Sequence, residues 1–316
     1  MIKWGLFVLK KYQNLILIIQ NEINLINNYI CECLNSNFIF LPKDLKNFLL
    51  NKSKKIRSVL AILFIKAKYG KISDKQLKVL SVAEMIHNAS LIHDDIIDEA
   101  KFRRKELTVN SLFGNGSAVI IGDYVLSISL KELNGFENTR LTNLFINSLY
   151  EICKGEFEQD FMKNKILTIE EYVKKSERKT AELFKTALTG ALIVENQQDI
   201  IDLAEKFAEN FGIMFQIKND LVNFSNVEKM SELAKNDFDN GIFTAPIIYL
   251  NEITDFAKIK NIKNDNSLFS YAVNKTNNLI NLYSRKTLDL ISSFPDNDYK
   301  TALINLCTEV QKGKNV

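Results

Sequence analysis

Apolar residues recur three or four positions apart along almost the whole chain, whereas strict two-residue alternation is rare. Two segments show the spacing clearly: Leu60, Phe64 and Ile65 in one, and Leu183, Ala187, Leu188 and Leu192 in the other. This spacing is typical of amphipathic helices, because residues three and four apart share one helix face. With only 3 prolines and 11 glycines, the chain also has few helix breakers. The pattern predicts an all-α protein.

Two sequence signals mark the starts of helices. Ser73 precedes Gln76 by three positions, and Thr168 precedes Glu171 by the same spacing. Both pairs fit a capping box, in which each side chain accepts a hydrogen bond from the backbone N–H of the other residue. Together with the apolar pattern, these signals predict a single-domain helical bundle over residues 1–316.

Composition limits the classes of partner. The 316 residues are 46% hydrophobic, which is enough for a sizeable core, and the net charge of +3 gives no reason to expect a nucleic-acid partner. Residues 1–35 are expected to contain an N-terminal helix. Within them, Met1–Gln20 is apolar but interrupted by lysines, which argues against a transmembrane segment and favours a surface helix. The four cysteines have no zinc-type spacing and follow no secretory leader, so we expect free thiols in a cytoplasmic protein.

The sharpest chemical feature is an acidic stretch, His-Asp-Asp-Ile-Ile-Asp-Glu, over residues 93–99. It ends an apolar segment that is predicted to be one long helix from about Asp74. Asp94 and Asp98 are four residues apart, so they share a helix face, where two carboxylates about 6 Å apart repel by roughly 3 kcal/mol at an effective dielectric of 20. The helix dipole also disfavours anions at this end. A divalent cation removes both penalties, and hard oxygen ligands suit Mg²⁺; a solvated acidic helix end is the alternative reading.

Basic residues flank the acidic stretch on both sides. Residues 101–105 read Lys-Phe-Arg-Arg-Lys, and residues 52–57 read Lys-Ser-Lys-Lys-Ile-Arg. Arginine is suited to forked contacts with phosphate oxygens. Carboxylates for a metal ion beside cations for phosphate predict a site for a diphosphate ester, although each basic run alone is more often a solvated face.

From about Lys54 to its C-terminus, the sequence resembles the trans-prenyl diphosphate synthases, and most closely their long-chain, octaprenyl-type bacterial members. The resemblance rests on a combination of motifs. They are the DDxxD motif Asp94-Asp95-Ile96-Ile97-Asp98, the pair Arg103-Arg104, Lys54 and Arg57, His87, Gly122-Asp123-Tyr124, Gly155-Glu156 with Gln159, Lys179-Thr180, and Phe215-Gln216-Ile217. The family fold is an all-α helical bundle of the isoprenoid synthase type.

The resemblance implies a Mg²⁺-dependent prenyltransferase that condenses isopentenyl diphosphate with an allylic diphosphate, farnesyl or geranyl, to give a linear polyprenyl diphosphate. The implied roles fall into three groups. Isopentenyl diphosphate is held by Lys54, Arg57, His87 and Arg104. The allylic diphosphate is gripped by Arg103, Lys179, Thr180 and Gln216. The metal ligands are Asp94, Asp98 and Asp220, and the implied catalytic set is Asp94, Asp98, Arg103 and Lys179. Fixed cations and Mg²⁺ then stabilise the charge of the departing diphosphate.

The second acidic motif departs from the family pattern. Residues 219–223 read Asn-Asp-Leu-Val-Asn, so Asp220 is the one carboxylate, and Glu232 and Ile242 replace two lysines. Lys229 or Lys235 are candidates to replace a lost cation. These changes leave open a weakly active or inactive regulatory subunit of a heteromeric synthase. A class I terpene cyclase is a further alternative, which the match to the isopentenyl site disfavours.

Product length and assembly follow from the same resemblance. The family sets its pocket floor just before the first motif, where this chain has the small residues Ala89 and Ser90, with Ile86 deeper in the helix. One helical turn is about 5.4 Å, roughly one isoprene unit, so small residues predict a long product. Family members are usually homodimers, and the apolar segment 118–130 is a candidate for a buried or interface helix.

Overall fold

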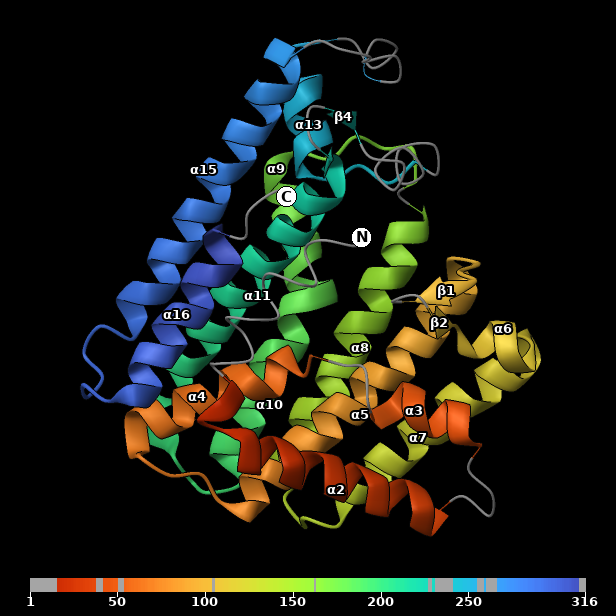
Figure 1. Ribbon diagram of the computed structural model, residues 1–316, viewed down its shortest axis with the longest axis vertical. Coiled ribbons are helices and arrows are strands. Elements are labelled where there is room, and N and C mark those ends of the chain that lie inside the picture. The colour runs from red at the N-terminus through yellow and green to blue at the C-terminus, as the bar shows by residue number, and fades with distance from the viewer. Residues whose placement is uncertain are drawn as a thin grey trace.

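The computed structural model describes residues 16–37, 42–50, 54–103, 106–161, 163–226, 229–230, 241–254, 259 and 266–312. Most of them lie in helices that pack side by side in a bundle (Figure 1). The longer helices are α2 (Gln20–Asn37), α4 (Ile56–Tyr69), α5 (Asp74–Ile97), α7 (Asn115–Asn134), α8 (Thr139–Phe161), α10 (Glu182–Ile193), α11 (Ile201–Phe224), α15 (Asn266–Leu290) and α16 (Asp298–Lys312). The shorter ones are α3 (Lys43–Leu50), α6 (Val109–Phe113), α9 (Ile169–Ser176) and α13 (Ala245–Asn251). The predicted all-α class is confirmed.

The predicted helix starts are also confirmed. At the start of α5, the Ser73 hydroxyl accepts a hydrogen bond from the Gln76 N–H at 3.2 Å, and the Gln76 side chain accepts one from the Ser73 N–H at 2.9 Å. Thr168 and Glu171 make the same reciprocal pair at the start of α9. These bonds satisfy donors that the first helical turn leaves without a partner, and so they fix where each helix begins.

Helix α5 lies at the centre of the packing. It packs against α2, α4, α7 and α10, while α11 packs against α10 on one side and α15 on another. Its buried side chains are not confined to one stripe: Val79, Leu80, Val82, Ala83 and Met85 are all fully buried. A helix with buried residues on all sides needs neighbours on every side. The neighbouring helices surround α5 along most of its length and leave its carboxylate end at the edge of the core.

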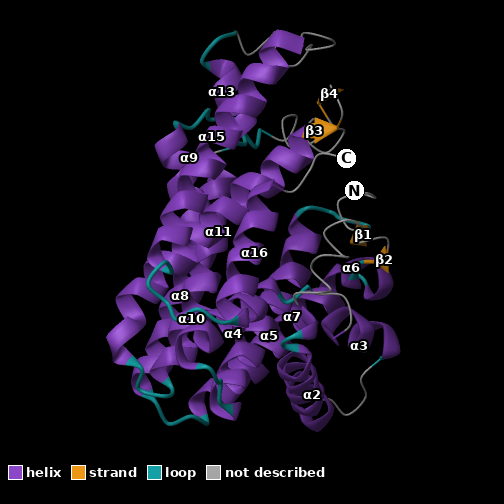
Figure 2. Cartoon of the chain, turned by 60° about the vertical axis from the view of Figure 1, so that its left-hand side comes forward, coloured by secondary structure: helices purple, strands orange, loops and turns teal. Residues whose placement is uncertain are grey.

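Two short antiparallel hairpins interrupt the helical pattern. The first pairs β1 (Phe102–Arg103) with β2 (Glu106–Leu107), and the second pairs β3 (Ser225–Asn226) with β4 (Lys229–Met230). Each hairpin follows one of the two helices that carry an acidic motif, α5 and α11. Figure 2 shows both hairpins on the same side of the molecule. The two acidic helix ends are therefore each continued by a hairpin on a common side of the bundle.

The described residues contain no helix that combines the length and the apolar character needed to cross a bilayer. The surface helix expected within Met1–Gln20 falls largely outside the described residues. The described part of the segment 1–35 contains most of α2, which spans Gln20–Asn37. The four cysteines are free thiols.

Candidate active site

A π-helical turn carries side chains that interact with both acidic helix ends. This turn, Glu177–Ala181, lies between α9 and α10 and carries Lys179 and Thr180. Helix α11 crosses it so closely at Gly212 that a Cβ there would lie 2.5 Å from the Cα of Ala181. Isolated π-turns inside helices are frequent at functional sites. Here the turn presents Lys179 to the carboxylates of α5 and Thr180 to the polar side chains of α11.

The predicted metal ligands of α5 differ in exposure: Asp94 is half-buried, and Asp98, at the end of the helix, is exposed. Burial raises the pKa of Asp94 to about 6, with Glu156 and Asp98 acting in the same direction and Lys179 opposing them. Burial also raises the pKa of Asp98, again against the effect of Lys179 and Arg103. Neither carboxylate has a hydrogen bond or an ion pair with another side chain in the part of the chain that the structure describes. Their oxygens are therefore available to a cation.

This donor set fits Mg²⁺ that is shared with a phosphate. Asp94 and Asp98 offer hard oxygen ligands from one helix face, and Mg²⁺ is commonly held by one or two carboxylates with substrate phosphates completing its shell. No group of three or more His, Cys, Asp or Glu side chains that could hold a metal ion lies within the described residues. Asp94 and Asp98 are candidate ligands by their chemistry and by their position on one face of α5.

Lys179 faces these carboxylates and is paired with a third. Its ammonium lies 2.7 Å from the Glu156 carboxylate of α8. Burial acts to lower the pKa of Lys179, but Glu156, Asp94 and Asp98 outweigh it, so the pKa is raised overall. The lysine therefore stays charged beside the α5 carboxylates, as a diphosphate ligand must. The sequence pointed to Glu156 as part of a motif but gave it no role, because its partner is 23 residues away in sequence.

Arg103 is held by the middle aspartate of the DDxxD motif. Its Nε donates to both oxygens of Asp95, at 2.8 and 3.0 Å, and its Nη2 lies 2.8 Å from one of them. Asp95 is only 1% exposed. This forked pair anchors the β1–β2 hairpin to α5, since Arg103 belongs to β1. Arg103 still lowers the pKa of Asp94 and of Asp98, so it lies near the predicted diphosphate position while its guanidinium is already oriented by the protein.

The α11 end is organised differently. Tyr172 of α9 donates to one oxygen of Asp220 at 2.6 Å, and Gln216 donates to the other at 2.8 Å. Thr180 in turn donates to the side-chain oxygen of Gln216 at 2.8 Å. Three of the predicted residues, Thr180, Gln216 and Asp220, therefore form one chain of hydrogen bonds, and Tyr172 is a member that the sequence did not reveal. Asn219 lies next to Asp220, half-buried.

The residues predicted to hold isopentenyl diphosphate are only partly brought together. Burial lowers the pKa of Arg57 to about 10, against the effects of Glu84 and Asp94, so this guanidinium lies near the α5 carboxylates. It stacks over the Phe184 ring at 4.8 Å, and its Nε is buried without a hydrogen-bond partner. Lys54 precedes α4 and His87 lies on α5, both half-buried. A half-buried cation whose Nε is a buried, unused donor is the kind of group that can bind an anion.

The remaining predicted residues lie on α5 or outside the described part of the chain. Ala89 and Ile86 are buried on α5, and the half-buried Ser90 donates to the His87 carbonyl. Arg104, Glu232 and Lys235 lie outside the described residues, as does the side chain of Lys229. Besides the role of Glu156, the sequence did not reveal that of Glu84. This residue is 1% exposed, and its carboxylate accepts hydrogen bonds from the Ser58 N–H at 3.2 Å and from the Ser58 hydroxyl at 2.8 Å. Its signal was a lone carboxylate within an apolar helix.

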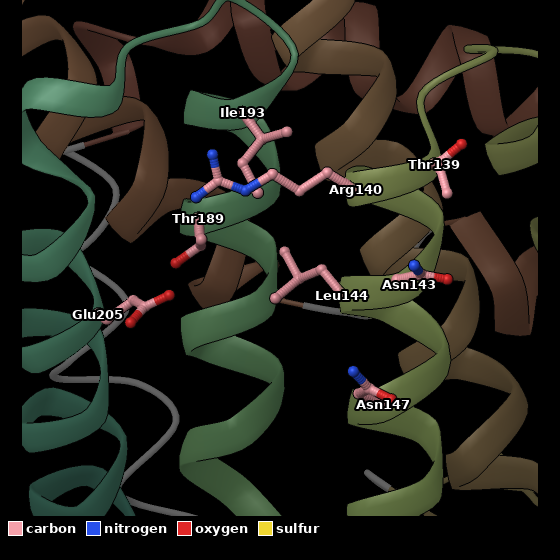
Figure 3. Close-up of a pocket in the computed structure, with 8 residues that line it drawn as sticks. All are labelled: Thr139, Arg140, Asn143, Leu144, Asn147, Thr189, Ile193 and Glu205. Atoms are coloured by element: carbon pink, nitrogen blue, oxygen red, sulfur yellow. The ribbon is translucent and has the colours of Figure 1, made fainter.

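A larger open cavity, of about 540 Å³, lies elsewhere, between the first turns of α8, the end of α10 and Glu205 of α11 (Figure 3). None of the predicted site residues lines it. Its charged members include Arg140, which donates to Gln198. The concentration of carboxylates with raised pKa values and of half-buried cations around α5 and the π-turn therefore identifies the candidate site better than cavity size does.

Comparison with known proteins places the chain among similar sequences and folds. The family model described as polyprenyl synthetase matches residues 41–279. A decaprenyl-diphosphate synthase of Dictyostelium discoideum is 30% identical over 268 residues, which cover 81% of this chain but only 59% of that protein. Decaprenyl-diphosphate synthase subunit 1 of Schizosaccharomyces pombe is 27% identical over 338 residues, covering 93% of this chain and 89% of that one.

Solved structures of polyprenyl synthases are also similar to this fold. A polyprenyl synthase from Caulobacter crescentus, solved in complex with calcium and isoprenyl diphosphate, matches with a TM-score of 0.82 at 19% identity, over 96% of this chain and 98% of that one. At this identity the match speaks for the fold alone, which is the predicted isoprenoid synthase bundle.

Proposed function

Because the chain belongs to the polyprenyl synthetase family, we propose that it is a prenyltransferase that condenses isopentenyl diphosphate with an allylic diphosphate, farnesyl or geranyl, to give a linear polyprenyl diphosphate. The observation that carries the proposal is the α5 end, where Asp94 and Asp98 are partly desolvated and unpaired beside Lys179. This arrangement of carboxylates is energetically unfavourable in the protein alone, and binding of a cation together with an anionic ligand relieves the cost.

The metal ion would be Mg²⁺ held by Asp94 and Asp98, with Asp220 as a further predicted ligand from α11. When bound, it supplies positive charge that stabilises the departing diphosphate. The structural support differs among the three residues, because both Asp220 oxygens already accept hydrogen bonds from Tyr172 and Gln216. Asp220 therefore acts in the proposal through one oxygen or through a bridging water.

The chain's own cations grip the allylic diphosphate. Lys179 keeps its charge through Glu156 and has further N–H donors to offer. Arg103 uses Nε and Nη2 on Asp95, which leaves Nη1 for a phosphate oxygen. Thr180 and Gln216 form the opposite, neutral wall. As the allylic C–O bond breaks, its electron pair passes to the diphosphate, and these fixed donors stabilise that charge without having to reorganise.

Isopentenyl diphosphate lies on the Arg57 side, held by Lys54, Arg57, His87 and Arg104. The half-buried Arg57 side chain, with a buried and unpartnered Nε, supports this position. The isopentenyl double bond then attacks the allylic carbon and a proton is lost. Small residues at Ala89 and Ser90, above Ile86, favour a long product along α5.

We further propose a homodimer in the cytosol, with residues 1–316 acting as one domain. Large apolar side chains are exposed on α7 and α8, including Ile120 at 69%, Tyr150 at 61% and Phe157 at 65%. Within the predicted segment 118–130, Ala118, Val125 and Ile128 are buried, so α7 has both a core face and an exposed apolar face. A face of this kind fits a second copy. Sedimentation of the purified protein tests this: a monomer at micromolar concentration contradicts it.

A regulatory subunit remains the second candidate. Two observations favour it: Asn219 and Asn223 replace carboxylates in the second motif, and the relative from Schizosaccharomyces pombe is named as a subunit. The free thiols do not separate the two candidates.

The test is product analysis. The purified protein is incubated with Mg²⁺, labelled isopentenyl diphosphate and farnesyl or geranyl diphosphate, and the dephosphorylated products are separated by length. We expect a ladder that ends at one dominant long product. Folded protein that incorporates no label with either primer would overturn the autonomous synthase and favour the regulatory subunit, and a cyclic hydrocarbon formed without isopentenyl diphosphate would indicate a cyclase.

A further inference from the structure

A second cavity, of about 150 Å³, lies beside the candidate site. It is a partly open space lined by the C-terminal part of α8, by α9 with the segment before it, by Arg178 of the π-turn, and by residues 241–243. A backbone hydrogen bond from the Asn164 N–H to the Gly241 carbonyl, at 3.0 Å, ties the segment before α9 to residues 241–243. We refer to this space as the α8–α9 cavity. None of the residues predicted for substrate or metal binding lines it.

The lining of the α8–α9 cavity carries excess positive charge. Its ionisable side chains are Lys165, Lys174, Lys175 and Arg178 against Glu158 and Glu171, so four cations face two carboxylates, a surplus of two. A concave surface with one dominant sign of charge concentrates the opposite charge. The whole chain, in contrast, has a net charge of only +3, so this cavity holds a large share of its excess.

Both carboxylates of the lining are already engaged. Glu158 lies 2.6 Å from the Arg178 guanidinium, and Glu171 lies 3.3 Å from the Lys165 ammonium. Glu171 also accepts the Thr168 N–H in its capping box at 2.8 Å, and the pKa of Glu171 is lowered by this bond and by Lys165. The ammonium of Lys174, in contrast, has no ion pair or hydrogen bond with a residue in the described part of the chain.

The remaining walls make the cavity a better place for an anion than open solvent. Leu167 and Phe243 are buried apolar side chains in its lining, and contact with apolar walls strengthens the attraction between a cation and an anion. Gln159, also in the lining, donates to Glu156 at 2.9 Å, and Glu156 is the partner of Lys179 in the candidate site. The cavity and the candidate site therefore share a wall.

We propose that the α8–α9 cavity binds a small phosphate anion, and specifically inorganic diphosphate. The choice of diphosphate rests on the proposed function, because each condensation breaks the allylic C–O bond with its electron pair on oxygen, forms one C–C bond, and releases one diphosphate and one proton. The cavity is too small for a nucleotide, but it can accommodate one or two phosphoryl groups. A diphosphate bound there is a released product that lies next to the site of its formation, separated from it by the wall that contains Gln159 and Glu156.

Calorimetric titration of the full-length protein with inorganic diphosphate, without metal ions, tests the proposal. The wild type is compared with Lys174→Glu,Lys175→Glu and with Lys206→Glu, which reverses an exposed charge on α11 outside the cavity. We expect the double variant to lose at least roughly tenfold in affinity and Lys206→Glu to lose less than roughly twofold. If the double variant is not folded by circular dichroism, Lys174→Gln alone is expected to weaken binding by roughly threefold.

Two further arms locate the anion and its source. If Lys179→Met abolishes diphosphate binding while Lys174→Glu,Lys175→Glu leaves it unchanged, the anion lies in the candidate active site and the proposal is overturned. Absence of any binding also overturns it. Titration with isopentenyl diphosphate separates the two sources of the anion. If the Lys174 variants weaken the binding of inorganic diphosphate but not of isopentenyl diphosphate, the cavity binds the released anion. If they weaken the binding of both equally, the cavity binds the head group of the substrate, and the choice of inorganic diphosphate is overturned. Because these readouts need no turnover, an inactive protein that binds diphosphate in a Lys174-dependent way contradicts the proposed function and not this site.

Discussion

The ends of α5 and α11 both carry predicted metal ligands, but their carboxylates have opposite surroundings. On α5, the carboxylates of Asp94 and Asp98 have no hydrogen-bond or ion-pair partner within the described residues, and burial raises the pKa of both. On α11, Asp220 accepts hydrogen bonds from Tyr172 at 2.6 Å and from Gln216 at 2.8 Å. A carboxylate that is desolvated without partners is costly until a cation arrives, whereas one that is bonded to neutral donors is already stabilised.

This difference indicates an uneven division of labour. The α5 end has carboxylates available to a cation, whereas at the α11 end, where Asn219 and Asn223 flank Asp220, the carboxylate is held in a hydrogen-bond network. The π-turn joins them, since Lys179 faces the first and Thr180 the second. The comparison predicts that variants at the α5 end affect metal binding and catalysis most, and that variants at the α11 end affect stability more.

The largest expected effect comes from removing both charges on α5. Asp94→Asn,Asp98→Asn is expected to lower kcat/KM for the allylic diphosphate by about 10³-fold or more, because the metal ion loses its protein ligands. Steady-state incorporation of labelled isopentenyl diphosphate measures it, and Asp202→Asn, an exposed change on α11, is the control. A decrease of less than about threefold in the double variant would show that the α5 carboxylates do not hold the metal.

The next effect concerns pH. Because the pKa of Asp94 is raised to about 6, its carboxyl keeps its proton below that pH, and a metal ion must displace it. The apparent affinity for Mg²⁺ is therefore expected to be constant above about pH 7 and to fall as the pH drops through 6, approaching tenfold per pH unit. Titration with Mg²⁺ between pH 5 and 8, followed by calorimetry, measures this. Asp94→Asn should lose most of the pH dependence along with affinity, and an affinity of the wild type that does not change over this range contradicts the assignment.

The smallest expected effect is at the α11 end. Tyr172→Phe removes one donor from Asp220 and leaves Gln216 in place, so the free energy of unfolding is expected to fall by about 1–3 kcal/mol. Urea unfolding measures the change. Tyr283→Phe is a matched control, because no hydrogen bond of the Tyr283 hydroxyl is found among the described residues. Equal losses in both variants would show that the Asp220 bond contributes nothing specific.

Local sequence predicted much of this arrangement. The helical spacing predicted the all-α class, both capping boxes were confirmed, and the i, i+4 spacing placed Asp94 and Asp98 on one face of α5. These features depend on neighbours a few residues apart. The pairing of Lys179 with Glu156, the π-turn and the contact of Gly212 with Ala181 were not predicted, because they depend on which helices cross and where. The resemblance named Arg103 as a phosphate ligand, but only the structure shows that Asp95 orients it.

The most direct test of the uneven division between the two helix ends is a count of bound metal ions. Mn²⁺ is measured by equilibrium dialysis in the presence of an allylic thiodiphosphate that cannot ionise, for the wild type, Asp94→Asn and Asp220→Asn. The account predicts that Asp94→Asn loses the tightly bound Mn²⁺ and that Asp220→Asn retains it, with affinity reduced by less than about tenfold. Tight Mn²⁺ binding that survives Asp94→Asn and disappears in Asp220→Asn would contradict the account.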